Sequence, residues 1–179
     1  MFRMILTHGL IAGVVVGVPL FMMGTLMADN PPTGAVGMAI GYLTMLIAFT
    51  TIFVAIKRRR DVELGGVIRF WPALGMGLAI ALVGSLCYIL AWEAVLAVNG
   101  GDFIASMSEQ MVAERQAAGA SAAEIAELRT QMAEMQRIYT NSFARFAITF
   151  VEVFPVGLLV SLLSAALLRN PRFLPLRTA

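Results

Sequence analysis

The sequence predicts an all-α polytopic membrane protein, with four transmembrane helices and an extracytoplasmic helical hairpin between the third and fourth. Hydrophobic residues make up 59% of the 179 residues and charged residues only 13%, which is too little polar surface for a water-soluble domain of this size. Four apolar runs reach the length of about 20 residues that crosses a bilayer. One of them stops at four consecutive cations, Lys57–Arg60, a junction typical of the cytoplasmic membrane surface.

The first two spans are expected at 4–28 and 34–56, within a single membrane domain that covers 1–179. No A-x-A cleavage site follows the first run, so we interpret it as a retained helix. Gly9, Gly13 and Gly17 recur every four residues and form one stripe of small residues, on which a neighbouring helix can approach closely. A polar turn at 29–32, Asp-Asn-Pro-Pro, separates the two spans.

The third and fourth spans are expected at 70–98 and 142–168. Trp71 and Trp92 would lie about 31 Å apart along a helix, which matches the two interfacial belts where tryptophan prefers to sit. Each span also carries a stripe of small residues with a spacing of four. In the third span it consists of Gly77, Ala81 and Ser85, and in the fourth of Gly157, Ser161 and Ala165.

The segment 99–141 is the one long polar stretch, and its pattern predicts a helical hairpin. Ser121 and Glu124 have the spacing of a capping box at the start of its second helix. A narrow apolar seam then follows at helical spacing. The seam consists of Ile125, Leu128, Met132, Met135 and Tyr139. We expect this second helix to continue without a break into the fourth span.

The distribution of basic residues predicts the orientation. Nine of the thirteen lie at Arg3, in the 57–69 loop or in the tail 169–179. The positive-inside rule therefore places both termini and this loop in the cytoplasm, and the hairpin outside. The predicted location is the bacterial inner membrane. The run Lys57, Arg58, Arg59 and Arg60 is interpreted as a topogenic signal that meets lipid headgroups and not as a nucleic-acid site, because two nearby acids offset part of its charge.

Glu93, Arg145 and Glu152 are polar residues within the predicted spans, where acids are costly and usually face the bundle interior. One interpretation is structural: Arg145 pairs with Glu93 near the surface, and a protonated Glu152 bonds to a neighbour. The other is functional: Glu152, close to the backbone carbonyl that Pro155 frees, binds a cation or passes a proton. The sequence leaves both open.

Other candidate chemistry is weak. The one cysteine, Cys87, lies in an apolar run, and a lone histidine, His8, cannot form a metal site. The sequence shows no nucleotide-binding loop, zincin helix or nucleophile elbow. We therefore expect no enzyme activity, no catalytic residue, no metal and no cofactor.

Several motifs resemble a family of small bacterial inner-membrane proteins known only as a domain of unknown function. The second span and its end carry GY-x-x-M-x-x-A and IF-x-AIK-x-x-RD, from Gly41 to Asp61. Further matches are GG-x-I-x-F from Gly65, Y-x-x-x-WE from Tyr88 and PVGL from Pro155. The resemblance implies a four-helix membrane domain and no particular activity.

Two functions remain open at this stage. The first is a non-enzymatic scaffold or interaction protein, which the three small-residue stripes favour as a homo-oligomer or as the partner of another membrane protein. The alternative is a small transporter or ion- or proton-conducting protein that uses Glu152 and Glu93. The two differ in whether these acids line a wet cavity or are sealed by packed side chains.

Overall fold

The computed structural model describes residues 1–27, 34–100 and 103–175, and all its regular elements there are helices. Four of them are long and apolar enough to span a membrane. They are α1 (Phe2–Leu26), α2 (Gly34–Arg58) with its π-helical extension η1 (Arg59–Glu63), α3 (Phe70–Asn99) and α6 (Ser142–Leu168). The predicted spans are thus confirmed as helices, while the predicted turn at 29–32 lies outside the described residues.

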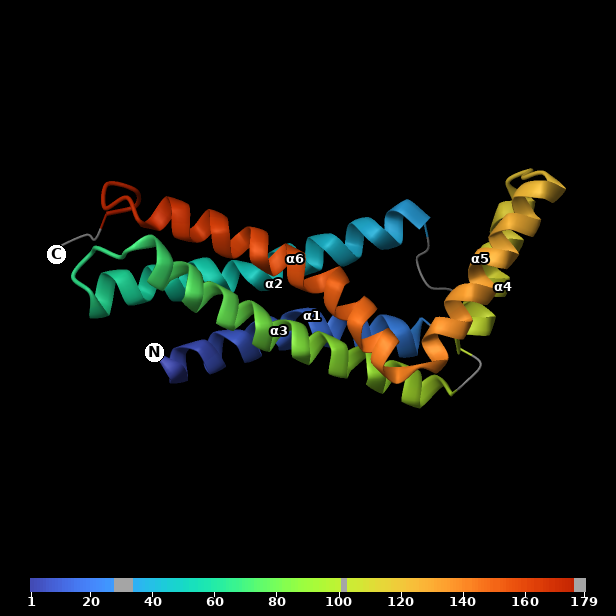
Figure 1. Ribbon diagram of the computed structural model, residues 1–179, viewed down its shortest axis with the longest axis horizontal. Coiled ribbons are helices and arrows are strands. Elements are labelled where there is room, and N and C mark those ends of the chain that lie inside the picture. Colours follow the sequence, from blue (N-terminus) through green and yellow to red (C-terminus); the bar gives the residue numbers. More distant parts are fainter. Residues whose placement is uncertain (28–33, 101–102, 176–179) are drawn as a thin grey trace.

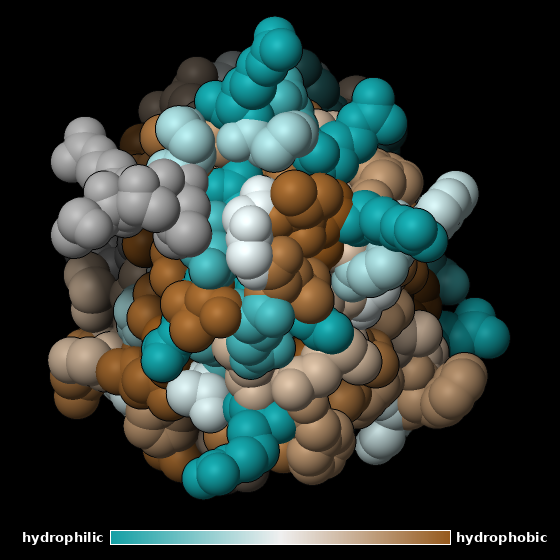
Figure 2. Space-filling view, turned by 90° about the vertical axis from the view of Figure 1, so that its left-hand side faces the viewer, coloured by the Kyte–Doolittle hydropathy of each residue, from teal (hydrophilic) through white to brown (hydrophobic). Residues whose placement is uncertain are grey.

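The four long helices form an elongated bundle in which α3 is central (Figure 1). It packs along α1 on one side and along α6 on the other, and α2 lies against α1 and α6. The N-terminus, the α2–α3 turn and the described segment after α6 lie at one end of the bundle. Figure 2 shows this end, where hydrophilic side chains are spread among apolar ones.

Two shorter helices, α4 (Phe103–Ala117) and α5 (Ala122–Thr140), lie side by side at the opposite end and project away from the bundle (Figure 1). The predicted capping box at the start of α5 is confirmed. The Ser121 hydroxyl accepts a hydrogen bond from the Glu124 backbone N–H, and the Glu124 carboxylate accepts one from the Ser121 N–H. The seam residue Ile125 is buried, whereas Met135 is exposed.

The prediction of one unbroken helix from α5 into α6 is wrong. Asn141 has an extended backbone, with φ −89° and ψ 107°, and separates the two helices. Its side-chain carbonyl accepts hydrogen bonds from the backbone N–H groups of Phe143 and Ala144, so it acts as the N-cap of α6. The break allows α5 to leave the bundle axis.

The small-residue stripes pack within the chain. A side-chain carbon added to Gly9 would lie 2.6 Å from Val83 of α3, and one added to Gly13 would overlap Cys87. On the other side of α3, a carbon added to Gly157 would lie 2.7 Å from Ala81. Glycine is therefore needed on these faces, because the neighbouring helix occupies the space of a side chain.

The end of α2 also differs from the prediction. The helix does not stop near 56 but continues through η1 to Glu63. Ion pairs one turn apart favour this continuation, Lys57 with Asp61 at 2.5 Å and Arg59 with Glu63 at 3.8 Å. These acids follow the cations by four residues, so the charges that mark the membrane boundary also extend the helix.

Candidate functional site

A cavity of about 530 Å³ lies between the bundle and the projecting helix pair. Residues of α1, α2, α3 and α6 line it, and α4 and α5 contribute to the lining at the far end of the bundle. The lining is mostly apolar, with Leu20, Met38 and Met111 among its members. A cavity of this size and composition is typical of small-molecule sites.

The cavity exists because α2 packs against the bundle only in its second half. The buried residues of α2 begin at Met45, and the first part of the helix is largely exposed. Figure 1 shows this part diverging from α1 and α3. Gly37 and Gly41 lie on its cavity side, and a side-chain carbon added to Gly41 would meet no atom within 4 Å. Residues without side chains thus leave this space open.

Glu152 is the acid that faces this cavity. It is the eleventh residue of α6, about 15 Å along the helix from Ser142 and therefore near the middle of a membrane span. The hydroxyl of Tyr88, a buried residue of α3, donates a hydrogen bond to its Oε1 at 3.4 Å. This bond is longer than the usual 2.5–3.0 Å, so most of the carboxylate's capacity to accept hydrogen bonds remains unused.

Glu93 and Arg145 form a bidentate ion pair instead. The Arg145 Nε donates to one carboxylate oxygen at 2.7 Å and its Nη2 donates to the other at 2.5 Å. The third guanidinium nitrogen, Nη1, donates to the Tyr139 carbonyl at 2.9 Å. Arg145 therefore ties together α3, the end of α5 and the start of α6, and it neutralises Glu93.

Tyr139 connects the two polar groups. It lines the Glu152 cavity and also a second hollow, of about 520 Å³, where Glu93 and Arg145 lie. Burial raises the pKa of its phenol, and the negative charge of Glu152 acts in the same direction. Tyr139 consequently keeps its proton at neutral pH. The two acids that the sequence analysis grouped thus lie in separate hollows.

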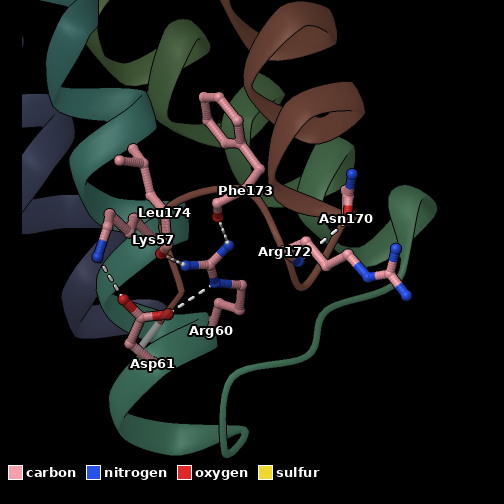
Figure 3. Close-up of polar contacts among 7 residues, drawn as sticks. All are labelled: Lys57, Arg60, Asp61, Asn170, Arg172, Phe173 and Leu174. Carbon is pink, nitrogen blue, oxygen red and sulfur yellow. Dashed lines mark hydrogen bonds and ion pairs between the residues drawn. The ribbon is translucent and has the colours of Figure 1, made fainter. Parts of the chain in front are cut away.

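The four consecutive cations do not act as one group. Arg58 is exposed, Lys57 pairs with Asp61, and Arg60 is fully buried, so the prediction that Arg60 meets lipid headgroups is wrong. The Arg60 guanidinium contacts Asp61 at 2.6 Å and donates hydrogen bonds to the carbonyls of Phe173 and Leu174, at 2.9 and 2.6 Å (Figure 3). It holds the segment after α6 against the end of α2.

Tyr88, Tyr139 and Trp92 line the cavity, but the sequence analysis assigned them no role at a site. It interpreted Trp92 as an interfacial residue, Tyr139 as part of the hairpin seam and Tyr88 as part of a family motif. A weak signal existed: Gly34, Gly37 and Gly41 recur at a spacing of three and four on α2, next to Tyr42. The small residues Ser161 and Ala165 are buried, on a face of α6 that packs in the bundle and not in the cavity.

Four helices that are long and apolar enough to cross a membrane indicate a helical protein of the membrane-spanning class. The chain belongs to a family described as protein of unknown function (DUF4199), whose pattern matches residues 7–170. No curated protein and no solved structure matches the chain.

Proposed function

We propose that this protein is a non-enzymatic membrane protein that binds a small, mostly apolar molecule in the cavity lined by Glu152. The observation that carries the proposal is the combination of an open, apolar-walled cavity with a carboxylate that accepts one weak hydrogen bond from the described residues. Glu152 is exposed to this open cavity. A charged group near mid-membrane is costly, and proteins retain such groups mainly at functional sites.

The proposal includes the orientation. Both termini and the α2–α3 turn lie in the cytoplasm of a bacterium, α4 and α5 lie outside, and the protein resides in the inner membrane. The excess of basic residues at the end that carries the N-terminus and the α2–α3 turn supports this arrangement. The cavity then lies in the outer half of the membrane, and ligands reach it from the outer leaflet or from outside the cell.

Conduction of ions or protons is a less favoured function. Glu93 is neutralised by Arg145, so it cannot serve as the next acid on a path from Glu152. Toward the cytoplasmic end, the space between the helices is filled by fully buried side chains, including Phe49, Val153 and Ser161. Packed side chains of this kind separate the cavity from the cytoplasm and favour binding without passage.

A pure scaffold role is also less favoured. The small-residue stripes were the main reason to expect a homo-oligomer, and in the structure they are covered by helices of the same chain. Binding of another membrane protein would have to use different surfaces, such as the exposed faces of α4 and α5.

Filling the cavity tests the proposal. Gly41→Phe adds a ring at a position that lines the cavity and where the first side-chain carbon meets no atom within 4 Å. Gly75→Phe is the matched control, because the first side-chain carbon at Gly75 also meets no atom within 4 Å and Gly75 does not line the cavity. The chain has two tryptophans, and Trp71 is exposed. A Trp71→Phe background therefore leaves Trp92, which lines the cavity, as the fluorescent reporter.

The probe is the neutral dye N-phenyl-1-naphthylamine, added to the protein in a non-ionic detergent. We expect saturable energy transfer from Trp92 to the dye in the parent and in Gly75→Phe, and at least a tenfold loss of affinity in Gly41→Phe. Partition of the dye into micelles is the same for all three proteins. Equal transfer in Gly41→Phe and Gly75→Phe would refute binding in the cavity.

A further inference from the structure

The charge of the cavity restricts what it can bind. Among the described lining residues, Glu152 is the single carboxylate, and none is a lysine or an arginine. The guanidinium of Arg145, in the second hollow, is occupied by Glu93 and by the Tyr139 carbonyl. An anionic ligand would thus find no positively charged partner among the described lining residues. A cationic ligand, in contrast, would pair with the Glu152 carboxylate.

The aromatic residues of the cavity also favour a positively charged ligand. All three tyrosines of the chain, Tyr42, Tyr88 and Tyr139, line this one cavity, and so does one of the two tryptophans, Trp92. The faces of aromatic rings attract cations, most strongly where water is excluded, and such groups of rings recognise alkylated ammonium ions. This concentration of rings in the cavity that holds the carboxylate is the second observation.

The rest of the lining excludes inorganic cations. Hard metal ions require about six oxygen ligands, and most of the lining side chains are apolar. Apolar side chains such as Leu20 and Met23 instead match hydrocarbon substituents, and the flexible methionines Met107 and Met111 can adapt to different shapes. The ligand should therefore carry one positive charge within an apolar body.

We propose that the cavity binds lipophilic organic monocations, such as protonated or quaternary amines, with Glu152 as the counter-ion and the tyrosine and tryptophan rings around the charge. This inference rests on the proposed function, because it specifies the chemical class of the ligand of that same cavity. It assigns Glu152 a direct contact with the ligand, and it assigns Tyr88 the positioning of the Glu152 carboxylate.

The test uses two ions of the same shape and opposite charge, tetraphenylphosphonium and tetraphenylborate, titrated into the Trp71→Phe protein while Trp92 fluorescence is recorded. Glu152→Gln removes the charge and keeps the size of the side chain. Glu134→Gln, at an exposed position on α5, changes the net charge by the same amount and serves as the control. Because the ions partition differently into micelles, each ion is compared only between proteins.

We expect Glu152→Gln to weaken binding of tetraphenylphosphonium at least tenfold, while Glu134→Gln binds it like the parent. Tetraphenylborate should bind weakly to the parent and no more weakly to Glu152→Gln. The neutral dye should bind Glu152→Gln and the parent equally, which also shows that the variant is folded. Unchanged phosphonium affinity in a Glu152→Gln protein that binds the dye would overturn the cation inference alone. If the parent binds neither the dye nor the cation, the proposed function is overturned as well.

Discussion

Replacing Arg60 should release the C-terminal segment from the end of α2. The buried guanidinium donates hydrogen bonds to the carbonyls of Phe173 and Leu174, and the Phe173 ring packs edge-on against Phe53 with centroids 6.4 Å apart. Arg60→Met keeps most of the apolar stem and removes the donors. Asp61 retains its ion pair with Lys57 at 2.5 Å, so the variant does not leave an unpaired carboxylate.

The magnitude follows from these two bonds. A hydrogen bond from a charged donor contributes about 1.5–3 kcal/mol, and the lower value is appropriate here because the released carbonyls regain water. Two bonds then give about 3 kcal/mol, which is roughly a hundredfold rise in the population of the released segment. The rate of cleavage by a protease rises in proportion to this population, provided that release of the segment is fast relative to cleavage.

Trypsin provides the assay, because Arg172 is exposed and its side chain points away from the Arg60 cluster (Figure 3). The initial rate of formation of the fragment that ends at Arg172 is measured by mass spectrometry on the protein in detergent. Arg58→Met is the matched control, since Arg58 is an exposed neighbour of the same type, and its rate should equal that of the parent. A rate for Arg60→Met within a factor of three of Arg58→Met would refute the role assigned to these bonds.

Three further predictions concern packing, pH and topology. Gly13→Ile should lower the stability of the detergent-solubilised protein by about 1–3 kcal/mol through overpacking against α3, while Val14→Ile at an exposed position should have little effect on its melting temperature. Hydrogen bonds from the N-cap of α5 hold the pKa of Glu124 below its usual 4.5, so their stabilisation is present at neutral pH and is lost on acidification. Helicity measured by circular dichroism should then fall as the pH is lowered below the usual 4.5 of a glutamate, and fall less in Glu124→Gln. A cysteine at Ala118 should react with a membrane-impermeant reagent added to intact cells, whereas a cysteine at Leu64 should not; the opposite labelling would reverse the orientation.

The helices were predictable because the lengths of the apolar runs dictate them. The bounds of each predicted span agree to within a few residues with those of a helix in the structure, apart from the end of α2. The missed break at Asn141 has a local cause: helical periodicity continues on both sides, and only the competition of its side chain for backbone N–H groups ends α5. A short polar residue between two helical patterns can thus end a helix even where the helical periodicity continues.

The site was harder to predict because it depends on contacts between distant parts of the chain. The sequence suggested the pair of Arg145 with Glu93, 52 residues apart, as one of two interpretations. It gave no indication of the contact between Arg60 and the Leu174 carbonyl, 114 residues apart. A run of cations at a membrane boundary gives no sign that one of them turns inward to such a partner. The cavity forms because the first half of α2 does not pack against the other helices. Sequence patterns predict which face of a helix packs, but they do not predict where packing is incomplete.

The position of α3 has a consequence for how the protein is made. α1 and α2 leave the ribosome first, yet the surface that fits the glycine face of α1 belongs to α3, at Val83 and Cys87. During synthesis, that face therefore borders lipid until the third helix enters the bilayer beside it. Assembly of the bundle is thus delayed relative to insertion, and a chain whose translation stops between α2 and α3 has two inserted helices but lacks the element that both α1 and α6 need.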